Sequence, residues 1–198
     1  MQLELVDYSQ NALGNIVTAG RNCYQSKGTG YESDVNLAKA LIKADHSPVE
    51  FGWAMFHISG ISRACADQLA RYRLASFTML SQRYVDIKDI EFVHPFQTLE
   101  IAGETAQAVE QAQRDFYRTL LNCGIKREDA RYYMGMGFST EVYMACNFRE
   151  LRHILKQRLD KHAQFEIRCV ANKILEICEE KFPWLVFDLG GENDAEAR

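Results

Sequence analysis

The chain has 198 residues, of which 47% are hydrophobic and 25% are charged, and its formal net charge at pH 7 is −4. This length is enough to bury the core of one domain, so we expect residues 1–198 to form a single domain. The acidic balance argues against general binding to nucleic acid or to a membrane surface, because both need a basic excess. No run approaches the roughly 18 apolar residues of a membrane-spanning helix, and the acidic start MQLELVDYSQ does not match a signal peptide.

Six cysteines are present, and neither a C-x-x-C pair nor the ligand spacing of a zinc site occurs among them. They are Cys23, Cys65, Cys123, Cys146, Cys169 and Cys178. We therefore expect buried free thiols, no bound metal and a location in the reducing cytoplasm.

The first half of the chain alternates between strand-like and helix-like patterns. Residues 2–8 alternate in polarity, which predicts an edge strand, and residues 11–24 have the apolar spacing of a helix. A second helix is expected over 34–44, with Ser33 as its N-cap. The aromatic-rich stretch 51–59 then predicts a strand.

The stretch 61–85 carries four arginines, three serines, a threonine and two tyrosines between apolar residues, with little acidic compensation. Arginine forks match phosphate oxygens and hydroxyl groups add donors, so this composition suits a bound anion. The alternative is an ordinary amphipathic helix followed by a loop and a strand. We expect Ser62 to cap a helix that runs to about Ala75, and a strand near 83–85.

The second half of the chain is mainly helical in pattern. Residues 91–95 predict a short strand, and 98–123 predict a long helix that ends at an Asn-Cys-Gly cap. Another helix is expected to begin over 127–134, where a Gly-Met-Gly sequence breaks it. Residues 139–146 alternate and predict a strand, and 147–181 predict one long helix.

That last predicted helix carries an anomaly on its apolar face. At about 100° per residue, one face collects an apolar stripe made of Leu151, Ile154, Leu155, Leu159, Phe165 and Cys169. Arg158 and His162 fall in the middle of this stripe, where a charge without a partner is costly. Arg158 therefore has three explanations: a buried ion pair, a surface arginine whose stem lies along apolar groups, or a ligand contact. For His162, a hydrogen-bonded core histidine and a functional histidine both remain open.

The order of residues from Arg71 to Tyr84 resembles R-H-R-x-x-S-x-[N/S]-x-x-S-x-R-Y, the signature of the flavin-dependent thymidylate synthases, the ThyX family. Six fixed positions match, namely Arg71, Arg73, Ser76, Ser81, Arg83 and Tyr84. Tyr72 replaces the usual histidine, Thr78 replaces the usual Asn or Ser, and Met79 stands where Glu or Gln is common.

Two further motifs extend the resemblance. The family segment H-x-S-P-x-E-H is matched at Ser47, Pro48 and Glu50, whereas Asp45 and Phe51 take the places of its two histidines. The last predicted helix resembles N-x-R-x-L-x-x-[NH]-L-x-x-R-x-x-x-x-A-Q-x-E-I-R through Asn147, Arg149, Leu151, His153, Leu155, Arg158, Ala163, Gln164, Glu166, Ile167 and Arg168. The stripe anomaly and the family motif thus select the same residue, Arg158.

The resemblance implies an α+β fold, with a twisted, mostly antiparallel sheet and long helices packed around it. It implies synthesis of dTMP from dUMP, with methylenetetrahydrofolate as the one-carbon donor. FAD would carry the hydride, because no side chain supplies one, and NADPH would reduce the flavin. It also implies a homotetramer in which each active site draws on several subunits.

The family motifs assign residues to these ligands. Those expected to hold dUMP are Gln68, Arg71, Ser81, Gln82, Arg83, Arg131 and Arg158. Those expected to face FAD are Ser47, Arg71, Tyr72, Arg73, Asn147, Arg149 and His153. Arg158 is the expected catalytic residue, because a cation in a dry site stabilises the developing uracil anion. Ser81 is expected to contact the nucleotide rather than to act as a covalent nucleophile.

The departures from the family pattern leave alternatives. A thioether at Met79, near the sugar, suits a related flavin-dependent C5-methylase that acts on UMP or another pyrimidine nucleotide. Another alternative is a flavoprotein or nucleotide-binding protein that has lost catalysis, but the retained Arg158, Ser81 and Arg83 argue against it. A nucleic-acid-binding module is disfavoured, because the arginines lie among apolar residues in an acidic chain.

Overall fold

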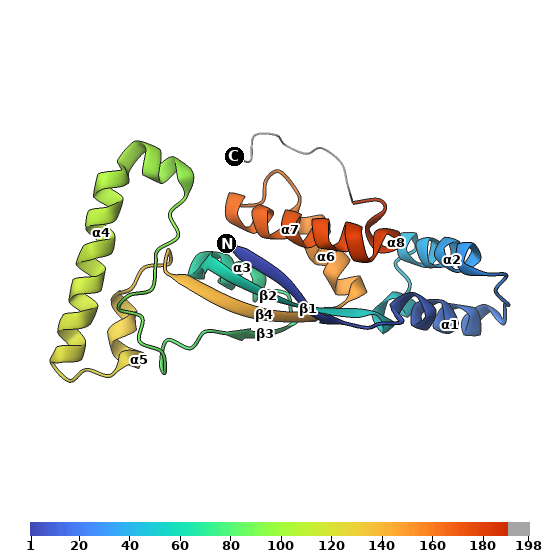
Figure 1. The fold of residues 1–198 in the computed structure, drawn as a ribbon, viewed down its shortest axis with the longest axis horizontal. Coiled ribbons are helices and arrows are strands. Elements are labelled where there is room, and N and C mark those ends of the chain that lie inside the picture. Colours follow the sequence, from blue (N-terminus) through green and yellow to red (C-terminus); the bar gives the residue numbers. More distant parts are fainter. Residues whose placement is uncertain (190–198) are drawn as a thin grey trace. The chain divides into compact units, whose positions relative to one another are not determined.

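The computed structural model describes residues 1–189, which run from an N-terminal strand to a short C-terminal helix (Figure 1). The strands are β1 Gln2–Tyr8, β2 Trp53–Ser62, β3 Ser76–Met79 and β4 Ser139–Asn147. The helices are α1 Ala12–Tyr24, α2 Tyr31–Lys43, α3 Arg63–Leu69, α4 Phe96–Asn122, α5 Arg127–Ala130, α6 Phe148–Arg158, α7 Phe165–Lys181 and α8 Pro183–Val186. Two short 3-10 helices, η1 Ser47–Phe51 and η2 Arg131–Tyr133, complete the described elements.

Within the described residues, four strands form one open antiparallel sheet in the order β1-β2-β4-β3. β1 is at an edge of this sheet, as its alternating sequence predicts. Along β2 and β4, buried residues alternate with more exposed ones, because successive side chains of a strand point to opposite faces. The expected α+β class is confirmed, since the chain combines this sheet with long helices.

The described chain divides into two compact units. The first unit contains residues 1–2, 59–69 and 78–142. The second unit contains residues 3–58, 70–77 and the described residues from 143 onward.

In the second unit, α1 packs against α2 and η1, and α6 packs against α7 and η1. Ile16 in α1, Leu41 in α2 and Leu155 in α6 are all at most 3% exposed, so the helices share a dry apolar core. Gly52 lets η1 approach α6 closely: the Phe148 amide donates to the Gly52 carbonyl at 2.8 Å. Any side chain at Gly52 would collide with the Phe148 ring.

In the first unit, α4 packs against α5 and η2. Figure 1 shows α5 beside one end of α4. Four residues with no exposed surface form the centre of this core: Ile87, Tyr117, Ala130 and Phe138. Tyr117 comes from the long helix α4, and Ala130 comes from the short helix α5. The apolar burial therefore joins the two helices to the segment that precedes α4.

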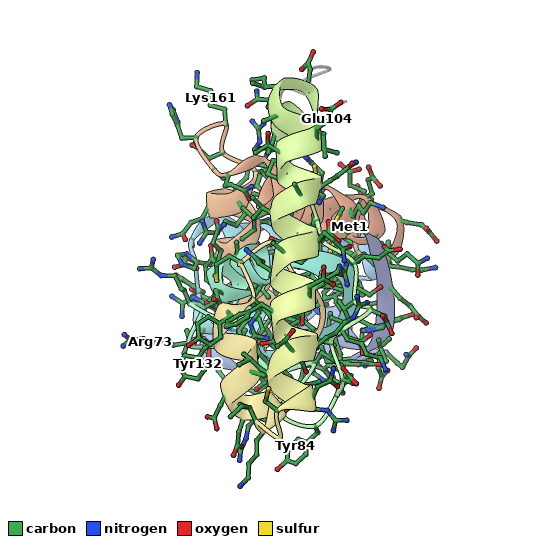
Figure 2. All side chains as sticks on the ribbon, turned by 90° about the vertical axis from the view of Figure 1, so that its left-hand side faces the viewer. Met1, Arg73, Tyr84, Glu104, Tyr132 and Lys161 are labelled. Carbon is green, nitrogen blue, oxygen red and sulfur yellow. The ribbon has the colours of Figure 1, made fainter. Side chains whose placement is uncertain are left out.

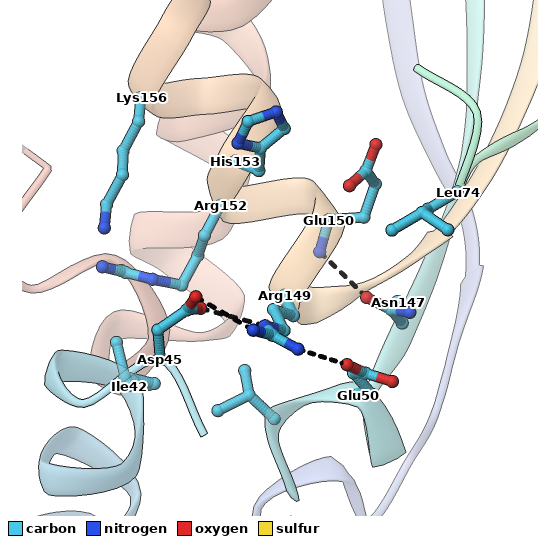
Figure 3. A pocket seen from close by; sticks show the side chains of 11 residues that line it. Ile42, Asp45, Glu50, Leu74, Asn147, Arg149, Glu150, Arg152, His153 and Lys156 are labelled. Carbon is cyan, nitrogen blue, oxygen red and sulfur yellow. Dashed lines mark hydrogen bonds and ion pairs between the residues drawn. The ribbon is translucent and has the colours of Figure 1, made fainter. Parts of the chain in front are cut away.

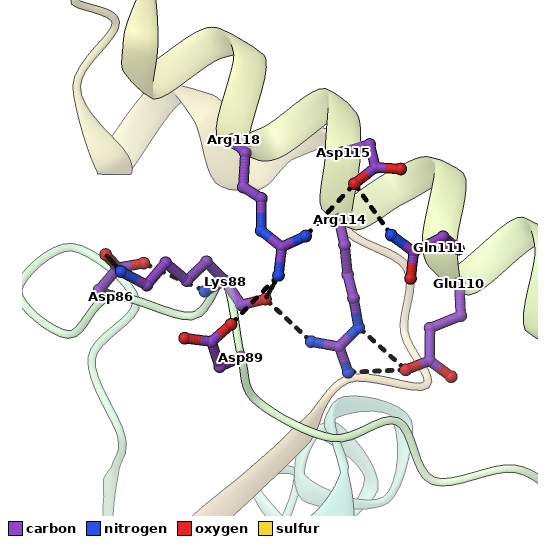
Figure 4. A network of polar contacts seen from close by, with 8 residues as sticks. All are labelled: Asp86, Lys88, Asp89, Glu110, Gln111, Arg114, Asp115 and Arg118. Atoms are coloured by element: carbon purple, nitrogen blue, oxygen red, sulfur yellow. Dashed lines mark hydrogen bonds and ion pairs between the residues drawn. The ribbon is translucent and has the colours of Figure 1, made fainter.

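Ionic side chains of α4 attach that preceding segment to the helix (Figure 4). Arg114 Nη1 donates to the Lys88 carbonyl at 3.0 Å, while its Nε and Nη2 donate to Glu110 at 3.0 and 2.6 Å. Arg118 pairs with Asp89 at 3.1 Å. Burial alone would raise the pKa of Glu110, but hydrogen bonds, chiefly from Arg114, outweigh it and lower that pKa. Glu110 therefore remains ionised at neutral pH and keeps its hold on Arg114.

The single long helix predicted over residues 147–181 is wrong, because α6 and α7 are separate helices. Between them, the Asp160 carboxylate accepts from the His162 backbone N–H at 2.8 Å and lies 2.9 Å from its ring Nδ1. The Gln164 side chain then accepts from two N–H groups in the first turn of α7. Such side-chain bonds compete with the helical ladder. His162 is 82% exposed in this turn, which excludes a core histidine.

The strand predicted at 83–85 is also wrong. The Ser81 carbonyl accepts from the N–H groups of Tyr84 at 3.2 Å and Val85 at 3.0 Å, which curls this stretch into a turn. The strand lies earlier, as β3, where it pairs with β4. The signature arginine in this stretch is therefore presented by a turn and not by a sheet.

Ser62 caps a helix as predicted, because its Oγ accepts from the Cys65 N–H at 3.0 Å. That helix, α3, ends at Leu69 and does not reach Ala75. The Ala75 N–H instead donates to the Tyr72 carbonyl at 3.2 Å, so a turn replaces the expected last turns of helix.

Three smaller boundaries differ from expectation. Ser33 is not an N-cap, because α2 already begins at Tyr31, after Gly30 with a φ of 129° that favours glycine. Residues 91–95 contribute a single bridge to the sheet region rather than a strand. The strand expected over 51–59 begins later, because η1 occupies its first residue.

Candidate functional site

The residues that the family motifs assign to ligands divide between the two units. The second unit holds every residue expected at FAD: Ser47, Arg71, Tyr72, Arg73, Asn147, Arg149 and His153. It also holds Arg158. The first unit holds the remaining residues expected at dUMP, which are Gln68, Ser81, Gln82, Arg83 and Arg131.

A cavity of about 390 Å³ lies in the second unit, among the end of α2, η1 and α6 (Figure 3). Asn147, Arg149 and His153 line it, so the structure brings three of the residues expected at FAD together. The other lining residues are Ile42, Asp45, Val49, Glu50, Leu74, Glu150, Arg152 and Lys156. Its volume falls within the roughly 300–1,000 Å³ of small-molecule sites.

Asn147 ends β4 and caps α6. Its backbone is extended, and its side-chain Oδ1 accepts from the Glu150 N–H at 2.9 Å. An N-cap of this kind satisfies one of the N–H groups that the first helical turn leaves without a partner. The cap fixes the start of α6, and with it the positions of Arg149 and His153.

Replacing Asn147 with alanine should lower the free energy of unfolding by about 1 kcal/mol, because the cap is lost. Urea unfolding measures the change. Asn147→Ser keeps an acceptor and should stay near the wild type, and Asn36→Ala, an exposed change within α2, serves as the control. Equal loss in the alanine and serine variants would contradict the capping role.

Arg149 is held by two carboxylates at the cavity wall. Its Nε and Nη2 donate to the two Asp45 oxygens at 3.0 Å each, and its Nη1 donates to Glu50 at 2.7 Å. The hydrogen bond from Arg149 lowers the pKa of Asp45, and the same bonds raise the pKa of Arg149. All three side chains are at least 40% exposed, so water and solutes reach this cluster.

Tyr72 and Arg158 lie against each other. The Arg158 guanidinium carbon is 5.2 Å from the centre of the Tyr72 ring, within the range of a cation–π interaction. Tyr72 is only 6% exposed, its hydroxyl donates to Gln157 Oε1 at 2.9 Å, and its ring contacts His153 edge-on at 5.8 Å. Burial raises the pKa of Tyr72, while neighbouring Arg158 opposes that rise.

The other residues expected at FAD are at the surface of the second unit. Arg71 and Arg73 are exposed on either side of the buried Tyr72 in sequence. Figure 2 shows Arg73 extending outward into solvent. Ser47 is exposed at the start of η1. The signature therefore presents two cations and one buried ring within three consecutive residues.

In the first unit, Glu128 joins two arginines that are expected at dUMP. Arg83 Nε and Nη2 both lie 2.8 Å from Glu128 Oε2, and Arg131 Nε donates to the Glu128 carbonyl at 3.1 Å. The structure thus brings Arg83 and Arg131 to one place. Ser81 supplies the turn beside Arg83, whose N–H lies 3.4 Å from the Ser81 Oγ. Gln68 in α3 and Gln82 in the turn are half-buried.

Three residues that contact the expected ligand-binding residues or line the cavity were not assigned a role from the sequence. Glu128 is three positions before Arg131, a spacing that places the two on one side of a helix, so this signal was present. Asp45 differs from the family pattern, and only its charge hinted at an arginine partner. Arg152 is 4% exposed and pairs with Asp188 at 2.8 Å, a partner too distant in sequence for any local pattern to indicate.

The expectation of buried thiols holds only in part. None of the six cysteines forms a disulfide bond, but Cys23 and Cys123 are exposed. Burial raises the pKa of Cys146 and of Cys178 to about 12, so these two thiols stay protonated and unreactive at neutral pH. In the part of the chain that the structure describes, no cluster of three His, Cys, Asp or Glu side chains is arranged to hold a metal ion. Nowhere in residues 1–189 does a helix combine the length and apolar character that a membrane span requires.

Comparison with known proteins identifies the family of the chain. Residues 4–184 match the model of the family described as thymidylate synthase complementing protein. A flavin-dependent thymidylate synthase of Sulfurisphaera tokodaii is 32% identical over 196 residues, which cover 93% of this chain and 76% of that protein. One from Geobacter sulfurreducens is 32% identical over 202 residues, covering 96% of this chain and 87% of that protein.

A solved structure agrees with these relatives. The crystal structure of thymidylate synthase X from Helicobacter pylori with FAD and dUMP is similar with a TM-score of 0.80 and 26% identity. The similarity covers 96% of this chain and 99% of that one. The chain therefore belongs to the family of flavin-dependent thymidylate synthases.

Proposed function

We propose that this chain catalyses the reductive methylation of dUMP to dTMP, with methylenetetrahydrofolate as the one-carbon donor and NADPH as the reductant of bound FAD. The observation that carries the proposal is the similarity, over 96% of this chain, to a solved thymidylate synthase X with FAD and dUMP. The relatives at 32% identity that are named flavin-dependent thymidylate synthases support it.

The residues of the second unit fit a flavin dinucleotide. Arg71 and Arg73 offer exposed guanidinium groups, which suit a pyrophosphate. Asn147, Arg149 and His153 line a cavity of about 390 Å³, large enough for part of the cofactor. When bound, the flavin supplies the hydride that no side chain can supply.

The first unit supports the nucleotide end of the proposal. Arg83 bonds to the Glu128 carboxylate and Arg131 donates to the Glu128 backbone carbonyl, so one residue contacts both guanidinium groups. A nucleotide phosphate carries more charge than a carboxylate and matches the same donors. We assign the phosphate to Arg83 and to the turn at Ser81 and Gln82, with Arg131 beside them.

Arg158 is the residue that we assign to catalysis. Its guanidinium rests on the Tyr72 ring, which fixes its position. Because burial raises the pKa of Tyr72, the phenol stays neutral at pH 7 and does not cancel the charge of Arg158. A fixed cation beside the uracil ring stabilises the anion left when the N3 proton departs. That charge makes the C5 carbon a stronger nucleophile towards the one-carbon unit.

Replacing Arg83 with alanine should raise the KM for dUMP by about 10- to 100-fold, the range expected when charge-assisted hydrogen bonds to a phosphate are lost. The kcat should change much less, because the phosphate does not react. Steady-state kinetics over a range of dUMP concentrations measures the two values. The matched control is Arg118→Ala, which removes an exposed, ion-paired arginine of α4 in the same unit. A KM that stays at the wild-type value would contradict the assignment of Arg83 to the phosphate.

The experiment that tests the function is product analysis with FAD, NADPH and methylenetetrahydrofolate, using dUMP or UMP as the acceptor. Strong preference for dUMP, with dTMP as the product, supports the proposal. Methylation of UMP in preference to dUMP would replace it with the alternative C5-methylase. Half-buried Met79 in β3 is the residue at which the two acceptors would be distinguished.

We extend the proposal to a homotetramer with shared active sites. In the first unit, α4 exposes Leu99, Ile101 and Val109, with Ile101 84% exposed, and these apolar side chains suit burial against another subunit. Size measurement by sedimentation tests this assembly. Six cysteines without a disulfide bond support a reducing, cytoplasmic location.

A further inference from the structure

The hydrogen-bonding capacity of Arg149 is largely used within the chain. Asp45 accepts from Nε and Nη2 at 3.0 Å each, and Glu50 accepts from Nη1 at 2.7 Å (Figure 3). A guanidinium has five N–H donors, and these three bonds occupy its forked edge and one further position. The fork is the part of arginine that binds a phosphate in two-pronged fashion. In this chain that part already holds a carboxylate.

The cavity around Arg149 has no excess of positive charge. Its carboxylates are Asp45, Glu50 and Glu150, and its permanent cations are Arg149, Arg152 and Lys156. Arg152 forms an ion pair with Asp188 at 2.8 Å and donates a hydrogen bond to a backbone carbonyl of α8. A pyrophosphate needs a basic excess, whereas a neutral ring needs apolar walls and a flat surface to pack on. Ile42, Val49 and Leu74 supply apolar wall in the same cavity.

Asp45 directly follows the C-cap of α2 and has a left-handed backbone conformation. Its φ is 51°, in the left-handed region that few residues other than Gly, Asn and Asp adopt readily. Its side chain is 73% exposed and that of Arg149 is 40% exposed, so the pair is solvated and adds little to stability. The left-handed conformation closes the C-terminus of α2, because the Asp45 N–H donates to the Ile42 carbonyl at 3.1 Å and the His46 N–H donates to the Leu41 carbonyl at 3.0 Å. The helix cap therefore fixes where the Asp45 side chain leaves the backbone. Since the exposed ion pair adds little stability, we assign the Asp45 carboxylate to the placement of Arg149.

We infer that Asp45, together with Glu50, is a positioning and specificity-determining residue for the flavin cofactor. The two carboxylates fix the plane of the Arg149 guanidinium, and we assign its flat face to the packing of a ring. The cavity then takes an uncharged, planar part of the cofactor, and the phosphates bind at other cations. This inference rests on the proposed function, because it requires that FAD binds.

The test is FAD affinity, measured by flavin fluorescence, in a double-mutant cycle of Asp45→Asn and Arg149→Lys. Asparagine tolerates the left-handed conformation, so Asp45→Asn removes the charge without backbone strain. Each single variant should raise the Kd for FAD by about tenfold, the effect of losing one charge-assisted hydrogen bond. The double variant should bind no more weakly than either single variant, because both changes remove the same placement of Arg149. The melting temperature of Asp45→Asn should move by less than about 4 °C, since the pair is exposed.

A second arm uses inorganic pyrophosphate as a competitor of FAD. In the Asp45→Gly/Glu50→Ala variant no side-chain acceptor remains at either position, and glycine keeps the left-handed conformation. The fork of Arg149 is then freed, so pyrophosphate should compete about tenfold more strongly than in the wild type. The matched control is Glu180→Gln, which neutralises a carboxylate in an exposed ion pair with Lys181 in the same unit. That control should leave both affinities unchanged.

Three results would overturn the inference while leaving the proposed function intact. FAD that binds Asp45→Asn more tightly would mean that Arg149 binds phosphate and that Asp45 competes with it. Unchanged FAD affinity in Asp45→Asn would make the contact irrelevant to the cofactor. If the increases in the Kd for FAD of the two single variants multiply in the double variant, Asp45 acts independently of Arg149. A wild-type protein that binds no FAD would instead overturn the proposed function, and the inference with it.

Discussion

Replacing Arg158 with alanine will lower the kcat for dTMP formation by about 100- to 1,000-fold, the cost of removing one placed electrostatic group from an active site. The reason is the position of Arg158 on the ring of neutral Tyr72, which holds a full positive charge in place. Single-turnover measurements with preformed reduced enzyme separate this chemical step from binding.

The Arg158→Ala protein should still bind FAD and should unfold at nearly the wild-type temperature, because a half-buried arginine in a cation–π contact contributes little to stability. Lys161→Ala is the matched control, since it removes an exposed cation from the turn that follows α6. If Arg158→Ala keeps more than about a tenth of the wild-type kcat, a loss of only about 1.4 kcal/mol, Arg158 does not stabilise the reacting uracil.

Replacing Arg152 with leucine should lower the free energy of unfolding by about 2–3 kcal/mol, because a buried acceptor and a partly buried carboxylate both lose their partner. Arg152 is 4% exposed, and it donates to the Leu185 carbonyl and to Asp188. These bonds join α6 to α8. The melting temperature should fall by about 5–10 °C for a chain of this size.

Lys156→Leu on the same helix is the control, because Lys156 is exposed and should change stability by no more than about 0.5 kcal/mol. Asp188→Asn provides a milder variant if Arg152→Leu does not fold. This variant keeps a hydrogen-bond acceptor at a side chain that is 33% exposed in the wild type. The free energy of unfolding should therefore fall less than in Arg152→Leu. Equal stability of Arg152→Leu and Lys156→Leu would contradict the account of the buried pair.

Many of the helices and strands are predicted correctly from local sequence pattern. The incorrect predictions have local physical causes. The alternation of residues 2–8 correctly predicts the edge strand β1, and the apolar spacing of 11–24 predicts α1. The break between α6 and α7 was missed, because the side chains of Asp160 and Gln164 end one helix and begin the next without a glycine or proline. The spacing of apolar residues alone cannot predict such side-chain hydrogen bonds.

The candidate site also depends partly on local sequence pattern and partly on contacts between residues that are far apart in the chain. The place of Arg158 on an apolar face left three explanations open from sequence, and the structure places its guanidinium over an aromatic ring. The partner, Tyr72, lies 86 residues earlier in the chain, in a segment that the structure brings to α6. No periodicity could place these two together. The Arg149 contacts were equally hidden, because Asp45 belongs to the end of another helix.

The most direct test of the central claim follows the absorbance of the FAD-loaded protein under anaerobic conditions. NADPH should bleach the flavin, and dUMP with methylenetetrahydrofolate should then restore the oxidised spectrum, with one dTMP formed for each flavin reoxidised. Neither substrate alone should restore it. A bleached flavin that stays reduced when both substrates are present would contradict the assignment of this chain to dTMP synthesis.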